Sequence, residues 1–137
     1  MASVKRINEV MDTEIDLTDT DAARKDANVT KGGVEFKDVC FSYGQAGDYV
    51  LEHINLQVNG GETVGIIGST GSGKTSLVQL IPRLYDATSG QVLIDGIDVR
   101  DYSLKNLREG VGMVLQKNIL FSGTIEENLK WGDDNAS

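Results

Sequence analysis

The pattern of apolar and polar residues predicts β structure in three stretches of this 137-residue chain. VEFKDVCFSY (34–43) alternates, and YVLEHINLQVN (49–59) is a second strand candidate that ends at a glycine-rich turn. QVLIDGIDV (91–99) predicts a hairpin, because Asp95-Gly96 between two apolar runs favours a two-residue turn. We therefore expect strands in these three parts of the chain.

Two further runs are apolar without alternation, which is typical of strands buried on both faces of a sheet. ETVGIIGS (62–69) is rich in β-branched residues, and VGMVLQ (111–116) is a second run of this kind. Both are expected to be buried strands.

Three segments in the second half of the chain predict helices. KTSLVQLIPRLY (74–85) has the pattern of a helix that Pro82 kinks or ends, since proline lacks the N–H that a helix interior needs. SLKNLREG (103–110) predicts a short helix that Ser103 caps. TIEENLKWG (124–132) is typical of the start of another helix.

Residues 1–32 have the character of a connecting arm. The segment 2–12 has a helical spacing of apolar residues, at Val4, Ile7, Val10 and Met11. The remainder of the arm is polar and mostly acidic, which indicates a solvated linker.

Composition narrows the classes of function. The net charge is −8 and the sequence pI is about 4.5, which argues against non-specific binding to nucleic acid or anionic membranes. The sequence contains no run of about 18 apolar residues, so we expect a soluble chain without membrane insertion. The single cysteine, Cys40, lies in an apolar run and is interpreted as a core residue, and one cysteine alone fits a reducing compartment.

A glycine-rich run after the first apolar strand candidate matches the phosphate-binding loop (P-loop, or Walker A) pattern G-x-x-x-x-G-K-[ST]. It follows a predicted buried strand and opens a predicted helix, which is the context that the motif requires. The candidate residues are Gly68, Ser69, Thr70, Gly71, Ser72, Gly73, Lys74, Thr75 and Ser76.

Each part of this motif has a physical role in binding phosphate. Gly71 and Gly73 allow the backbone to turn so that successive N–H groups face an anion, and the helix start adds its own N–H groups. Lys74 supplies a positive charge to the β- and γ-phosphates, and the hydroxyl of Thr75 is a ligand that Mg²⁺ accepts. The motif therefore predicts a site for a nucleoside triphosphate with Mg²⁺.

Binding a nucleotide does not imply hydrolysis, which also needs an acidic group near Mg²⁺. Asp95 in VLID is the local candidate, and it keeps open a small P-loop kinase or GTPase. The following Gly96 favours a hairpin turn instead, and no substrate or guanine-specificity motif is found. A non-enzymatic ATP-binding or interaction module is a further alternative.

The sequence around the P-loop resembles the nucleotide-binding domain of ATP-binding-cassette (ABC) exporters, especially the multidrug type. The stretches that carry the resemblance are FSYG, the P-loop itself, LIPRLYDATSGQVLIDGIDVRDYSLKNLR and VGMVLQKNILFSGTIEENLKWG, and together they cover about 34–132. The resemblance implies an α/β P-loop NTPase fold, the ABC-type ATPase core, with an N-terminal antiparallel β subdomain and an incomplete domain. Residues 1–32 would be the linker from the transmembrane domain and 33–137 a partial nucleotide-binding domain.

The resemblance also implies roles for two residues outside the P-loop and for a surface. Tyr43 would stack on adenine, and Gln116 would be the Q-loop residue that contacts Mg²⁺ and the attacking water's surroundings. Lys74 and Gln116 are thus the candidate catalytic residues. The stretch NILFSGTIEENL would meet the coupling helices of a transmembrane domain, and a second nucleotide-binding domain would complete the dimer at the cytoplasmic face of the cell membrane.

Several motifs of the family do not occur in this sequence. It has no LSGGQ signature, no four apolar residues followed by Asp-Glu after Gln116, and no histidine in that part either. We therefore expect a truncated domain that alone binds Mg²⁺–ATP weakly without turnover. The full-length form would couple ATP hydrolysis to export across the membrane.

Overall fold

Four antiparallel strands form one sheet in the computed structural model, which describes residues 2–12, 17–20, 23–44, 47–117 and 119–132. The strands are β1 (Val34–Phe41), β2 (Leu51–Val58), β3 (Ser89–Ile94) and β4 (Ile97–Asp98), in the order β2-β1-β3-β4. This sheet confirms the strands predicted in 34–43 and 49–59 and the hairpin predicted in 91–99.

Some predicted features fall outside the described residues. These are residues 1, 13–16 and 21–22 of the predicted linker, residue 118 of the predicted coupling surface, and residues 133–137 of the predicted domain.

The β3–β4 turn has the geometry that its sequence requires. Asp95 and Gly96 both have positive φ, 52° and 81°, as a two-residue hairpin turn with matching twist demands. Ile94 pairs with Ile97 across this turn, and the turn thereby fixes the register of the hairpin.

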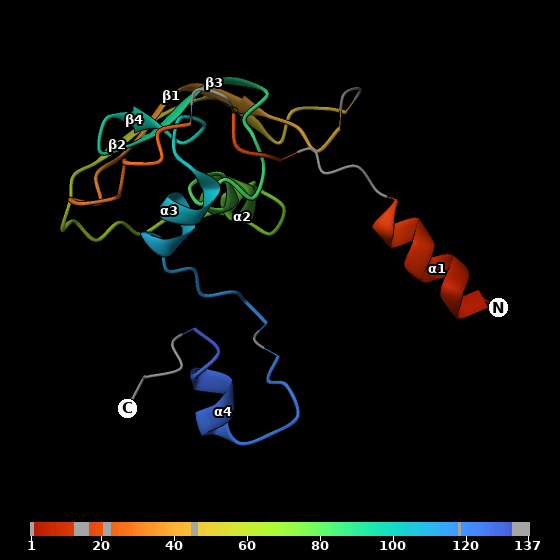
Figure 1. Ribbon diagram of the computed structural model, residues 1–137. Coiled ribbons are helices and arrows are strands. Elements are labelled where there is room, and N and C mark those ends of the chain that lie inside the picture. Colours follow the sequence, from red (N-terminus) through yellow and green to blue (C-terminus); the bar gives the residue numbers. More distant parts are fainter. Residues whose placement is uncertain (1, 13–16, 21–22, 45–46, 118, 133–137) are drawn as a thin grey trace.

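Two short helices pack beneath the sheet (Figure 1). They are α2 (Lys74–Leu80) and α3 (Leu104–Glu109). α2 ends two residues before Pro82, as predicted, and the hydroxyl of Ser103 caps α3 by accepting from the Asn106 N–H. The core between sheet and helices includes Phe36, Val39, Phe41, Leu77, Leu80, Val92, Ile94, Tyr102 and Leu107.

The two remaining helices lie apart from this body (Figure 1). α1 (Ala2–Met11) confirms the predicted helix, and its residues Val4 and Ile7 are exposed, whereas the side chain of Val10 lies outside the described part. α4 (Ile125–Leu129) begins with a capping box between Thr124 and Glu127. Among the described residues, no helix has the length and apolar character to cross a membrane.

The two predicted buried strands are corrected by the structure. Residues 62–69 and 111–116 are not strands, and their apolar side chains are largely solvent-exposed, with Ile67 99% and Val114 87% exposed. The physical reason is that a strand needs a hydrogen-bonded neighbour, and neither segment has one in the described part of the chain. Their apolar composition predicts burial, but it does not supply the partner.

The described parts of the arm at 17–20 and 23–32 contact the body and are therefore not wholly solvated. Ala27 belongs to the buried core, and the Asn106 side chain donates to the carbonyls of Lys25 and Ala27 at 2.9 and 3.0 Å. The Asp19 carboxylate accepts from the Leu104 N–H at 2.7 Å, at the first turn of α3. The assignment of residues 1–32 as a linker stays a prediction.

Candidate functional site

The predicted P-loop lies directly before α2, next to the sheet, and is largely exposed to solvent. Gly71 and Gly73 have φ of 82° and 81°, a region that favours glycine. A Cβ on Gly73 would lie 2.8 Å from Leu51 Cδ2 and 2.9 Å from the Val50 carbonyl oxygen, so the loop touches β2 too closely for any side chain. Gly73 also precedes α2 without a side-chain cap. The first N–H groups of α2 are therefore left to other acceptors.

The ammonium group of Lys74 lies within the loop. Its Nζ donates to the carbonyls of Gly68 and Ser69 at 2.8 and 2.6 Å and to Ser72 Oγ at 3.1 Å. An ammonium has three N–H donors, so these three acceptors occupy all of them. A phosphate oxygen that binds Lys74 must therefore replace at least one of these bonds.

A cavity of about 330 Å³ opens beside the loop and is lined by Tyr43, Val50 and residues 71–76. Thr75 lies exposed in the first turn of α2, and its hydroxyl has no hydrogen-bond partner among the described residues. A positive charge, an uncapped helix start and a free hydroxyl fit a phosphate chain with its Mg²⁺. The loop residues at this position thus fit the predicted ligand.

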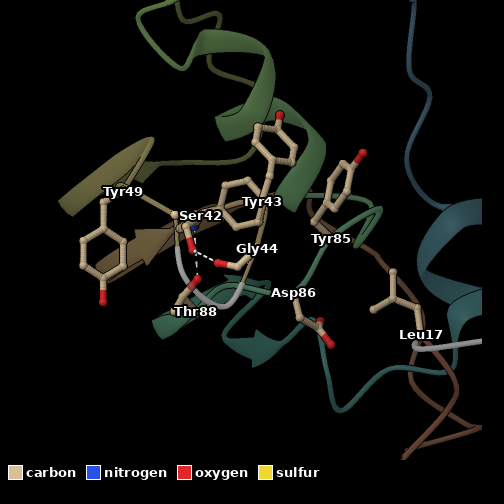
Figure 2. Close-up of a pocket in the computed structure, with 10 residues that line it drawn as sticks. Leu17, Ser42, Tyr43, Gly44, Tyr49, Tyr85, Asp86 and Thr88 are labelled. Atoms are coloured by element: carbon tan, nitrogen blue, oxygen red, sulfur yellow. Dashed lines mark hydrogen bonds between the residues drawn. The ribbon is translucent and has the colours of Figure 1, made fainter.

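Tyr43 lines the same cavity, and its hydroxyl end points toward α2 (Figure 2). Its hydroxyl is 2.7 Å from Ser76 Oγ, and its ring packs edge-to-face on Phe41 and Tyr85 with centroids 4.8 and 5.1 Å apart. The side chain remains 56% exposed. The structure therefore brings Tyr43 together with the P-loop and leaves ring surface available for stacking.

Tyr43 also lines a second cavity, of about 440 Å³, whose lining residues are drawn in Figure 2. Tyr49, Tyr85 and Asp86 contribute to its walls. The Asp86 carboxylate accepts hydrogen bonds from Nε and Nη2 of Arg83 at 2.7 and 3.1 Å, so its negative charge is already paired.

Asp95 lies in the hairpin turn, with its carboxylate facing the arm. Its oxygens accept from the backbone N–H groups of Thr30, Lys31 and Gly33 at 2.7, 2.9 and 2.9 Å. Burial opposes the charged form, but these backbone hydrogen bonds outweigh it and lower the pKa of Asp95. Asp95 does not line the P-loop cavity, which disfavours it as a Mg²⁺ ligand there.

Gln116 is not brought to the P-loop. It is exposed in the segment that leads from α3 toward α4 (Figure 1), and it does not line the P-loop cavity. Its amide has no hydrogen-bond partner in the described part of the chain. The contact of Gln116 with Mg²⁺ therefore stays a prediction.

Comparison with known proteins identifies the family. The model of the ABC transporter family matches residues 51–137, more than half of the chain and the part that contains the P-loop. The chain belongs to the ABC transporter family.

Relatives of this ABC transporter chain are much longer. YgaD of Bacillus subtilis (strain 168), provisionally named a multidrug export ATP-binding/permease protein, is 49% identical over 137 residues, which are 100% of this chain and 23% of YgaD. An ATP-dependent lipid A-core flippase of Syntrophus aciditrophicus (strain SB) is 40% identical over the same length, 22% of the flippase. The chain thus spans less than a quarter of these relatives.

A solved structure supports the same fold. A bacterial Atm1-family ABC exporter, determined with ATP bound, superposes with a TM-score of 0.87 at 32% identity, over 99% of this chain and 24% of the exporter. The predicted α/β P-loop NTPase fold with an antiparallel β subdomain is confirmed.

The residues that pack against Tyr43 in this ABC transporter chain were not predicted from the sequence. Phe41 and Tyr43 are two residues apart in the predicted strand 34–43, which would place them on one face, although in the structure β1 ends at Phe41 and Tyr43 lies in a bend. Tyr85 and Val50 carry no such signal, because each comes from a separate loop that only the fold brings to Tyr43 or to the P-loop cavity.

Proposed function

We propose that this chain is the ATP-binding part of the nucleotide-binding domain of an ABC exporter. In this proposal residues 1–32 are the linker from a transmembrane domain, and residues 33–137 are part of the nucleotide-binding domain. The single observation that carries it is the P-loop geometry: Lys74 inside the loop, Gly73 packed against β2, and the uncapped start of α2. Family membership supports the same ligand class.

Each residue would have a distinct task in holding Mg²⁺–ATP. Lys74 and the loop N–H groups would bind the β- and γ-phosphates, and Tyr43 would stack on the base. Thr75 and Gln116 would be ligands of Mg²⁺, which when bound offsets the charge of the phosphates. Gln116 would have to approach the loop for this, because it lies exposed in the segment after α3.

The chain alone would bind Mg²⁺–ATP weakly and would not turn it over. Hydrolysis needs an acidic group beside Mg²⁺ and a group that orients water. The carboxylate of Asp95 is held by backbone N–H groups of the arm, so it is not available for either task. A longer protein with a second nucleotide-binding domain would supply these groups.

The proposed partners are a transmembrane domain and that second domain, at the cytoplasmic face of the membrane. The apolar residues of 119–131 support a protein-binding surface, because Leu120, Phe121, Ile125 and Leu129 are all more than half exposed.

The proposal is tested by measuring ATP affinity with and without Mg²⁺, together with phosphate release, for the unmutated chain and Thr75→Ala. We expect Mg²⁺ to strengthen binding to the unmutated chain and to strengthen binding to Thr75→Ala much less. Phosphate release should equal that of buffer. Absence of any ATP binding, or turnover that Lys74→Ala abolishes, would contradict the proposal.

A further inference from the structure

We propose that residues 23–33 form a strap that docks on the body and opens as one unit, and that its docking is coupled to ATP binding through α3. The strap is the part of the arm that leads directly into β1. The coupling rests on the proposed function, whereas the opening of the strap as one unit does not.

The first half of the strap is held by α3 and the residues before this helix. The Arg24 N–H donates to the carbonyl of Asp101 at 2.6 Å, and Arg24 forms a parallel β-bridge with the residue that follows. The amide of Asn106, in α3, donates to the carbonyls of Lys25 and Ala27 at 2.9 and 3.0 Å. Asn106 lies 81 and 79 positions from these two residues, so the tertiary fold holds this part of the strap.

The second half of the strap is held by the β3–β4 turn. The Asp95 carboxylate accepts from three backbone N–H groups of the strap, and the Asp95 N–H donates back to the Gly33 carbonyl at 2.8 Å. A Cβ on Gly60 would collide with the Lys31 carbonyl, so the strap also lies close against the turn after β2. The strap thus has two attachment points, Asn106 and Asp95, on different elements of the body.

Apolar contacts lie between these two attachment points. Ala27 is 7% exposed and belongs to the core, and Val29 packs against that core. Val29 also lies close to the end of α3, since a Cβ on Gly110 would be 2.6 Å from the Val29 Cβ. Loss of either attachment point exposes the same two apolar side chains, so we expect the strap to open as one unit.

α3 connects the strap with the helix that follows the P-loop (Figure 1). The guanidinium of Arg108 donates to the carbonyls of Pro82 and Arg83 at 3.3 and 2.9 Å, just after the end of α2. α3 therefore binds the strap through Asn106 and the end of α2 through Arg108. ATP at the start of α2 would hold this helix, and with it the carbonyls that Arg108 binds. By thermodynamic linkage, ATP then favours the docked strap by the same factor by which the docked strap favours ATP.

Hydrogen exchange of the full chain, followed by mass spectrometry on fragments that separate 23–28 from 29–33, tests the proposal. The variants are Asn106→Ala and Asn106→Asp, which keeps the shape of the side chain but replaces its donor amide by an acceptor. Lys105→Ala is the matched control, because Lys105 Nζ lies 3.9 Å from the Glu109 carboxylate on the surface of α3. Exchange in β1 is the internal reference for opening of the whole body, and circular dichroism confirms that each variant is folded.

The decisive readout without nucleotide is exchange in 29–33, whose N–H groups are held by Asp95. Both Asn106 variants should speed exchange there roughly ten-fold relative to β1, as much as in 23–28, which is the effect of one to two hydrogen bonds. Lys105→Ala should stay within about two-fold of the unmutated chain. Faster exchange confined to 23–28 would mean that the contacts open separately, and it would overturn the single unit.

The coupling is tested by adding saturating Mg²⁺–ATP to the same exchange experiment. Exchange in both parts of the strap should slow about two- to five-fold relative to β1, and Arg108→Ala should remove this effect. ATP that binds without slowing exchange in the strap, or that slows it equally in Arg108→Ala, would overturn the coupling and leave the proposed function in place. If ATP does not bind the unmutated chain, the proposed function fails and the coupling fails with it.

Discussion

Two parts of the molecule have a similar content of apolar residues, but one part buries them and the other exposes them to solvent. The sheet β1–β4 with α2 and α3 buries its apolar residues, and Leu80, Val39 and Tyr102 are fully covered. The segments 62–69 and 111–116 have equally apolar sequences, yet Ile67 and Val114 face solvent. Apolar composition therefore predicts that a segment needs to be buried, whereas formation of a strand also depends on a neighbouring strand with which it can form hydrogen bonds.

Two of the strand pairs in the described sheet form between neighbouring segments of the chain, whereas β1 and β3 pair over a long sequence separation. β1 and β2 are separated by a short connection, and β3 and β4 by a two-residue turn, so each pair forms from local chain. The segment 62–69 needs a partner that arrives from elsewhere, as buried strands of parallel sheets do. The P-loop combines both situations, because Gly73 packs on β2 whereas the segment that precedes the loop is unpaired in the described part of the chain.

The largest expected contrast is between a buried and an exposed apolar residue of the two parts. Leu80→Ala should lower the free energy of unfolding by about 3 kcal/mol, because Leu80 is 0% exposed and its removal leaves a cavity. Ile67→Ala should change it by less than about 0.5 kcal/mol, because Ile67 is 99% exposed. Urea denaturation followed by circular dichroism measures both. If Ile67→Ala lost as much stability as Leu80→Ala, the segment 62–69 would contribute to the folded core, contrary to this prediction.

A second contrast compares two glycines. Gly73→Ala should cost roughly 2 kcal/mol, because φ is positive there and the new Cβ would crowd Leu51. Gly112→Ala, in the unpaired segment, has open space for a Cβ and should be neutral within about 0.5 kcal/mol. The same urea titration tests this pair of variants. A destabilised Gly112→Ala would show that the segment 111–116 makes close contacts around Gly112, contrary to the prediction.

The unpaired segments should also cause weak self-association, because Val64, Ile66, Ile67, Val114 and Leu115 expose apolar surface. Ile67→Asp should weaken association roughly ten-fold, a change of about 1.4 kcal/mol, since it places a charge where an apolar contact would form. Ile7→Asp on α1 is the control for an exposed isoleucine outside these segments. Sedimentation equilibrium over a range of concentrations decides it; a monomer at every concentration would contradict this prediction.

The smallest effect concerns the arm that Asp95 holds to the body. The folded pKa of Asp95 lies below its unfolded value, so the carboxylate stabilises the fold above about pH 4 and loses that contribution as the pH falls further. Asp95→Asn should cost about 1 kcal/mol at neutral pH and should flatten the pH dependence of stability below pH 4. Asp26→Asn, an exposed aspartate of the arm, is the matched control. Thermal unfolding from pH 3 to 7 measures this, and an unchanged pH profile in Asp95→Asn would speak against it.

The sequence correctly predicted the turns, caps and helix ends that depend on residues close together in the chain. The Asp95-Gly96 turn, the Ser103 cap and the end of α2 before Pro82 each depend on a few neighbouring residues, and each is found. The P-loop glycines and Lys74 were also predictable, because the motif specifies backbone shape within one loop. The prediction failed where the outcome depends on distant chain: the missing pairs of 62–69 and 111–116, the docking of Ala27, and the approach of Tyr85 to Tyr43.

A calorimetric titration of the chain with Mg²⁺–ATP tests the proposed ATP site most directly. Lys74→Ala removes the charge at the centre of the loop, and Lys105→Ala, which changes a lysine on the surface of α3, is its matched control. We expect weak but saturable binding that Lys105→Ala preserves and Lys74→Ala abolishes. No binding by the unmutated chain, or binding that survives Lys74→Ala, would contradict it.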